Sequence, residues 1–96
     1  MKLDLVGKAL KDLDGGIIPD EKDGKPIPLN KLLARILADA GGEDPLKLFE
    51  LAIALNKDAP VSVDTSDREL IEKVIKASRH TALVKGQLLL ELKGIS

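Results

Sequence analysis

Acidic residues, glycines and prolines are concentrated near the N-terminus, in the segment DLDGGIIPDEKDGKPIP at residues 12–28. Its five carboxylates could ligate a cation, and calcium loops place oxygen ligands at positions 1, 3 and 5, a glycine at 6 and a glutamate at 12. Counting from Asp12 puts Ile17 at position 6, and counting from Asp20 puts Lys31 at position 12. Neither register fits, so we interpret the aspartates as turn formers and predict no metal site.

Few other residues could carry out catalysis. His80 is the only histidine and there is no cysteine, so a Ser-His-Asp arrangement or a zinc site would depend on one imidazole. His80 follows Arg79 between two predicted helices, where a surface histidine is the simpler interpretation. No G-x-x-x-x-G-K-[S/T] phosphate loop is present. We therefore predict a protein that is not an enzyme, with no catalytic residues and no cofactor.

Composition narrows the class of protein further. Ninety-six residues are typical of one domain, and the apolar residues are almost all aliphatic, with Phe49 the single aromatic. The net charge of −1 is spread evenly along the chain, so no strong field attracts nucleic acid or an anionic membrane. The longest apolar runs, such as LAIAL at 51–55, are far shorter than a membrane span. These features predict a soluble protein of the cytoplasm.

The chain from residue 29 onward has the apolar spacing of four helices. PLNKLLARILADAGG predicts the first, ended by Gly41 and Gly42, and Asp44 with Pro45 predicts the start of the second, over 44–56. Ser66 and Glu69 form a capping-box pattern for the third helix. Thr81 is the predicted N-cap of the fourth, over 82–93, where Gly86 indicates close contact between helices, with a functional hinge as the alternative.

Residues 1–28 are harder to interpret. Residues 2–13 fit either a strand or a helix, whereas Asp14-Gly15 and Asp23-Gly24 are turn dipeptides that flank the β-branched GIIP. We predict a β-hairpin or extended segment folded over the helices. The predicted fold is therefore a single, mainly α domain of about four helices (1–28 cover, 29–96 helical) with a minor β component.

The prediction of function is based on the two most apolar predicted helices, over 44–56 and 82–93. They contain more leucine than one small core readily buries, so an exposed aliphatic face for a protein partner or for self-association is expected, with a tightly packed helix pair as the alternative. The candidate partner-binding residues are Phe49, Leu51, Leu83 and Leu90. A second hypothesis is a small nucleic-acid-binding regulator that uses the basic joint of the last two helices, at Lys73, Lys76, Arg79 and Lys85.

The order of these segments is similar to that of small proteins encoded by tailed bacteriophages and prophages. The resemblance is carried by DLDG…DGKP, LNKLLARIL, DPLKLFELAIAL, VDTSDRELIEKVI and LVKGQLLLEL, and covers the chain from about Leu13 to Leu92. It implies a non-enzymatic assembly or adaptor role among virion morphogenesis proteins, in a bacterium or a phage-infected host cell, and it transfers no functional residues. The partner and the oligomeric state are left open.

Overall fold

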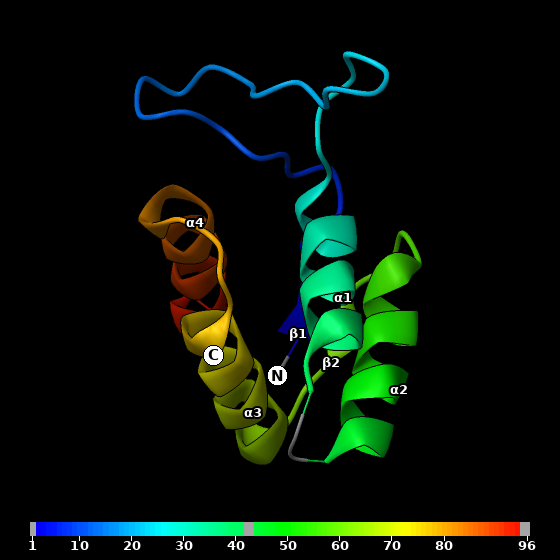
Figure 1. Ribbon diagram of the computed structural model, residues 1–96. Helices are drawn as coiled ribbons and strands as arrows, with labels where there is room; N and C mark the ends of the chain where they lie inside the picture. The colour runs from blue at the N-terminus through cyan, green and yellow to red at the C-terminus, as the bar shows by residue number, and fades with distance from the viewer. Residues whose placement is uncertain (1, 42–43, 95–96) are drawn as a thin grey trace.

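The computed structural model describes residues 2–41 and 44–94 and contains four α-helices and two short strands. The elements in chain order are β1 (Lys2–Leu3), α1 (Leu29–Asp39), α2 (Pro45–Asn56), β2 (Val61–Ser62), α3 (Thr65–Ala77) and α4 (Ala82–Lys93). Helix α1 packs against α2 on one side and α3 on the other, and α4 packs against α3 (Figure 1). The predicted mainly α class with a minor β component is confirmed.

Residues 2–13 contain a strand and no helix. β1 pairs antiparallel with β2, with Lys2 opposite Ser62 and Leu3 opposite Val61. This pairing brings the start of the chain to the connection between α2 and α3. The N-terminal residues are therefore held by a segment about sixty residues further along the chain, which local sequence does not reveal.

The acidic segment forms the two predicted turns. Gly15 and Gly24 have positive φ angles of 85° and 70°, and each turn is closed by an isolated β-bridge, Lys11 to Ile17 and Pro19 to Pro26. The Asp12 carboxylate accepts hydrogen bonds from the backbone N–H groups of residues 14 and 16, at 2.9 and 2.8 Å. Its role is thus turn formation. The segment crosses one end of the molecule, above α1 and α4 in Figure 1.

Two of the predicted helix boundaries differ from the structure. α1 ends at Asp39 with Ala40 as an extended C-cap, and Gly41 has no positive φ; Gly42 lies outside the described residues. α3 begins at Thr65 because Asp64, not Ser66, is its N-cap. Asp64 and Asp67 form the reciprocal capping box, since aspartate is as good an N-cap as serine and stands two residues earlier.

The other caps agree with the sequence, but the role assigned to Gly86 does not. Asp44 accepts a hydrogen bond from the Lys47 backbone N–H, and Thr81 accepts one from the N–H of Val84. Gly86 was expected at a close contact between helices. This prediction is wrong, because a Cβ atom at Gly86 would have no neighbouring atom within 4 Å.

The core is aliphatic and draws on almost every element. Its most deeply buried large side chains are Leu3, Leu5, Leu33, Leu37, Leu55, Ile71, Ile75, Leu88 and Leu92. One buried amide fixes α1 against α2: the Asn30 side chain donates to the backbone oxygen of Leu55 at 3.0 Å and to the Asp58 carboxylate at 3.2 Å. Since Asn30 is in the first turn of α1 and Leu55 in the last turn of α2, the two helices run antiparallel.

Candidate functional site

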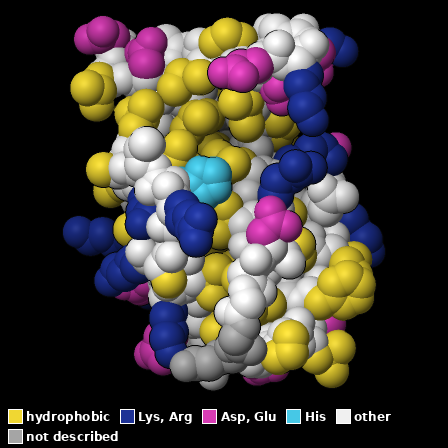
Figure 2. Space-filling view, in the orientation of Figure 1, with side chains coloured by type: hydrophobic (Ala, Val, Ile, Leu, Met, Phe, Trp, Pro, Cys, Tyr) yellow, Lys and Arg dark blue, Asp and Glu magenta, His cyan; other side chains and the backbone are white. Residues whose placement is uncertain are grey.

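Helix α2 has a row of exposed apolar side chains on its outer face. This row, which we call the α2 stripe, consists of three large hydrophobic residues at helical spacing, all exposed to solvent: Leu46, Phe49 and Ile53. The opposite face of the helix is buried in the core through Leu48, Leu51, Ala52 and Leu55. Hydrophobic side chains are visible over α2 at the right-hand edge of Figure 2. Helix α2 is therefore apolar on both its inner and its outer face.

The α2 stripe borders a groove between α1 and α2, the α1/α2 groove, with a volume of about 610 Å³. Small side chains from the two helices lie in it, since both contribute alanine. The lining residues are Lys31, Ala34, Arg35, Ala38 and Asp39 of α1 and Phe49, Ala52, Ile53 and Asn56 of α2. Phe49 and Ile53 thus belong to both the stripe and the groove, which together form one continuous surface.

The charged residues of the groove are ordered along α1. The α1 edge of the groove has three charged residues spaced by about one helical turn, Lys31, Arg35 and Asp39. Along this edge, two cationic side chains are followed by an anionic one. Lys31 lies near the C-terminal end of α2, where its ammonium donates to the Asn56 backbone oxygen at 3.3 Å. Asp39 lies at the opposite end, toward the start of α2, because the two helices are antiparallel.

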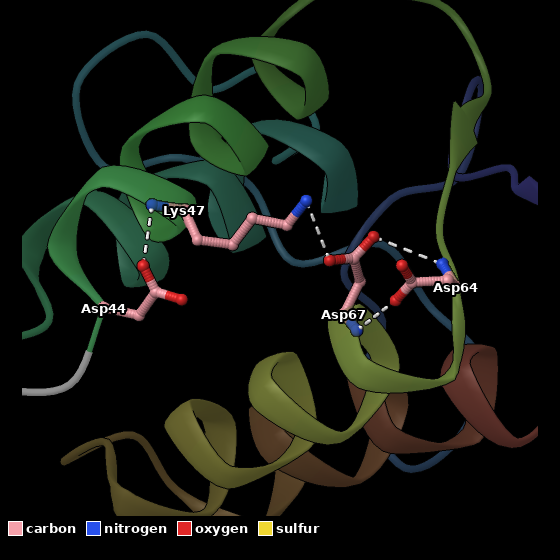
Figure 3. A network of polar contacts seen from close by, with 4 residues as sticks. All are labelled: Asp44, Lys47, Asp64 and Asp67. Atoms are coloured by element: carbon pink, nitrogen blue, oxygen red, sulfur yellow. Dashed lines mark hydrogen bonds and ion pairs between the residues drawn. The ribbon is translucent and has the colours of Figure 1, made fainter.

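An ion pair on the side of α2 that faces α3 holds α2 in place. The Lys47 ammonium lies 3.0 Å from a carboxylate oxygen of Asp67, a residue that is only 6% exposed, and Asp67 also belongs to the α3 capping box (Figure 3). Burial by itself raises the pKa of Asp67, but the hydrogen bonds from Lys47 and from the Asp64 backbone outweigh it, so the pKa lies below its ordinary value. The same pair raises the pKa of Lys47 through its hydrogen bond and its attraction to Asp67.

The four residues predicted to bind a partner do not form one surface. Phe49 is 58% exposed on α2 and Leu90 is 68% exposed on α4, and these helices lie on opposite sides of the molecule (Figure 1). Leu51 is 5% exposed and belongs to the core, so its assignment as a partner-binding residue is wrong. Leu83 is only half-buried. Of the predicted set, Phe49 alone lies in a wider exposed apolar row.

The basic residues proposed for nucleic-acid binding lie near the α3–α4 joint, and part of their hydrogen-bonding capacity is used within the protein. The Lys76 ammonium pairs with Glu72 at 2.8 Å, and the Lys85 ammonium donates to the Lys76 backbone oxygen at 2.9 Å. The Lys76 hydrogen bond and charge lower the pKa of Glu72. Lys73 and Arg79 are exposed. These contacts favour a helix-capping role for Lys85 over contact with phosphate.

His80 and Arg79 line a second hollow, of about 500 Å³, between the end of α1 and the end of α3. Asp39 and Ile36 contribute from α1, so Asp39 lies between this cleft and the α1/α2 groove. The histidine in Figure 2 is surrounded by hydrophobic and basic side chains. His80 is exposed, as expected for a surface histidine. Ser78 lines the same hollow, and its hydroxyl donates to the Ile75 backbone oxygen at 2.8 Å.

Within residues 2–41 and 44–94, no group of three or more His, Cys, Asp or Glu side chains could hold a metal ion. None of the described helices has the length and apolar character needed to cross a membrane. In comparisons with family models, curated proteins and solved structures, none matches this chain.

Sequence reasoning identified Phe49 but missed its neighbours Leu46 and Ile53. Because α2 is apolar around most of its circumference, its sequence does not indicate which side faces the core. The polar residues of α2 give no reliable guide, since Lys47 points toward α3 and its ion pair with Asp67. The packing of α2 against α1 decides which side of α2 is exposed.

Proposed function

We propose that this protein is a non-enzymatic protein–protein interaction module that binds through the α2 stripe and the adjoining α1/α2 groove. The main support for this proposal is that three large apolar side chains are exposed in one row, Leu46, Phe49 and Ile53. The sole aromatic residue of the chain is in this row and not in the core. Phenylalanine has much to gain from burial, so its position on the surface favours burial by another molecule.

The composition of this surface fits what protein interfaces need. Interfaces commonly have an apolar centre that includes aromatic side chains, surrounded by a polar rim. Here the stripe supplies the apolar centre, and the exposed Lys31, Arg35 and Asp39 supply one charged rim. The groove beside the stripe offers a concave surface into which a partner side chain can pack.

The resemblance to small phage and prophage proteins supports an assembly or adaptor role, and this biological setting is part of the proposal. Binding is the activity for which the exposed α2 stripe and the adjoining α1/α2 groove are suited. Protein binding is favoured over nucleic-acid binding because the continuous exposed surface is apolar, whereas part of the basic joint is engaged in internal hydrogen bonds.

Site-specific photo-crosslinking tests the proposal and does not require the partner to be identified in advance. Phe49 is replaced by p-benzoylphenylalanine in one variant and Leu90 in a matched control, because both positions are exposed but lie on different helices. The proteins are irradiated in cells that naturally contain this chain. We expect a covalent adduct of higher mass from position 49 and not from position 90.

Mass spectrometry of the adduct identifies the molecule bound. A discrete protein adduct at position 49 alone supports the proposal. Absence of any adduct at position 49, or the same adducts at both positions, contradicts it, because a specific docking surface must distinguish the two sites.

A further inference from the structure

The N-terminal segment contains two Asp-Gly pairs, Asp14-Gly15 and Asp23-Gly24, which can undergo the same spontaneous reaction. The backbone nitrogen that follows an aspartate can attack the carboxyl carbon of its side chain and close a succinimide ring. Glycine in the second position favours this attack, because it has no Cβ atom to hinder the approach. By sequence alone, both pairs are therefore candidate sites of aspartate isomerisation.

The structure holds the two carboxylates differently. The Asp23 carboxylate accepts a hydrogen bond from the Lys25 backbone N–H at 2.9 Å, and this bond must break before the side chain can turn toward the Gly24 nitrogen. The Asp14 carboxylate is exposed and, within residues 2–41 and 44–94, forms no hydrogen bond or ion pair. The Asp14 side chain can therefore rotate toward the next nitrogen without losing a hydrogen bond.

The two glycine nitrogens differ in the same direction. The Gly24 N–H donates to the Asp20 backbone oxygen at 2.8 Å, whereas the Gly15 N–H donates to the Asp12 backbone oxygen at 3.1 Å. The longer hydrogen bond is the weaker one, so the Gly15 nitrogen is more easily freed for the attack. Both glycines have open space around them, so steric access does not distinguish the two pairs.

We propose that Asp14-Gly15 is a site of spontaneous isomerisation to isoaspartate, and that the fold favours it over Asp23-Gly24. In the first step, the Gly15 nitrogen bonds to the carboxyl carbon of Asp14, and the hydroxyl of the protonated carboxyl leaves with the proton of that nitrogen as water. In the second step, water adds to the main-chain carbonyl carbon of residue 14, and the bond from this carbon to the Gly15 nitrogen breaks.

The Gly15 nitrogen then remains bonded to the former side-chain carbon of residue 14. The water lost in the first step is regained in the second, so the mass of the chain is unchanged and the reaction requires no oxidant, reductant or cofactor. This inference does not depend on the proposed function, because it concerns a different part of the molecule.

The product changes a turn that is connected to helix α4. Isomerisation adds a carbon atom to the main chain at residue 14, inside the turn that the Asp12 N–H closes by donating to the Gly16 backbone oxygen at 2.8 Å. The adjacent Lys11 backbone exchanges two hydrogen bonds with the Gln87 side chain of α4. The reaction therefore alters the main chain close to a contact between the N-terminal segment and the helices.

Incubation of the full chain in mildly acidic buffer, followed by peptide mapping, tests the inference. Trypsin separates the two pairs because Lys22 lies between them. Electron-transfer fragmentation of each peptide distinguishes the main chain of isoaspartate from that of aspartate. In the folded chain, we expect isoaspartate to form about fivefold faster at residue 14 than at residue 23, the factor that corresponds to one net hydrogen bond.

Two controls separate the effect of the fold from that of local sequence. In guanidinium chloride, where the turns are lost, the two rates should become similar. Asp14→Glu keeps the charge but moves the carboxyl carbon out of succinimide geometry, so it abolishes the product at residue 14 and leaves the rate at residue 23 unchanged. Absence of isoaspartate at residue 14, or equal rates in the folded chain, overturns the inference. A preference for residue 14 that persists in guanidinium chloride overturns the role of the fold.

Discussion

Asp67 connects three parts of the molecule through one carboxylate. The Asp67 carboxylate pairs with the Lys47 ammonium of α2 and accepts a hydrogen bond from the Asp64 backbone N–H at 3.2 Å. The backbone N–H of Asp67 in turn donates to the Asp64 carboxylate at 2.7 Å. A buried carboxylate is tolerated only when it is paired or hydrogen-bonded, and here it is both. The pairing of residue 47 with residue 67 was not predicted, because the two positions belong to different helices.

The lowered pKa of Asp67 predicts a loss of stability in acid. The native state holds this carboxylate ionised below the ordinary aspartate pKa, so between the native and unfolded pKa values the unfolded chain binds more protons. The contribution of Asp67 is complete above the unfolded pKa and disappears as the pH falls through the native pKa. Urea unfolding from pH 6 to pH 2 (about the range over which aspartate titrates) measures it.

The expected comparison is with a variant that cannot ionise at this position. Asp67→Asn shows a smaller decrease in unfolding free energy with falling pH than the unmodified chain. Identical pH dependence for Asp67→Asn and the unmodified chain would contradict this role for the ion pair.

The N-cap of α3 offers a second test at the scale of single residues. Asp64→Ala removes the acceptor for the Asp67 N–H and is expected to lower the free energy of unfolding by about 1 kcal/mol, as N-cap losses do. Ser66→Ala, at the residue that the sequence favoured as the cap, should change it by less than about 0.5 kcal/mol. Denaturant titration at neutral pH distinguishes the two, and a larger effect at Ser66 would show that the cap is misassigned.

Helices α2 and α4 show how far a helical pattern predicts structure. Their existence and their caps at Asp44 and Thr81 were predictable, because capping and helical spacing depend on residues within one turn of each other. Which leucines are buried was not, since Leu51 and Leu90 are chemically the same and differ only in the neighbours that folding gives them. The tertiary contacts of α2 decide that Leu51 is buried, whereas Phe49 is exposed.

For α4, the prediction concerns the stability effect of replacing Gly86. With open space around its position and a helical backbone, Gly86→Ala is expected to stabilise the protein by about 1 kcal/mol. For a domain of this size, such a gain raises the melting temperature by roughly 4–8 °C. Calorimetry measures the shift.

Gly15→Ala is the matched control, because its φ of 85° is unfavourable for any residue with a Cβ, and we expect it to lower the melting temperature. Destabilisation by Gly86→Ala would mean that a close contact is present at that helix after all.

At the scale of the whole molecule, the N-terminal segment is part of the folded unit and not an added cover. Leu3, Leu5 and Leu10 are buried in the common core, and the Gln87 side chain of α4 exchanges two hydrogen bonds with the Lys11 backbone, at 2.9 and 2.7 Å. An ion pair joins Lys8 to Glu91. The boundary at residue 28 therefore marks a change of secondary structure within one core.

This arrangement predicts that the N-terminal segment and the helices unfold together. Leu5→Ala, at a position that is 2% exposed, should lower the free energy of unfolding by about 2–5 kcal/mol and shift a single transition. Leu13→Ala in the same segment should have little effect, because Leu13 is 92% exposed. The unfolding transition is followed by the circular dichroism of the helices. An unchanged midpoint of this transition for Leu5→Ala would mean that the N-terminal segment unfolds independently of the helices.

The sequence by itself determined the helical class, the start of α1 after Pro28, the turns at Gly15 and Gly24, and the capping of α2 and α4. All of these depend on interactions between residues close together in the chain. Only the tertiary structure decided the pairing of β1 with β2, the Lys47–Asp67 ion pair, and which side of α2 is exposed. These features depend on contacts between distant segments, and an apolar helix without a clear polar face does not specify its own orientation. The α2 stripe, and with it the candidate interface, belongs to this second group.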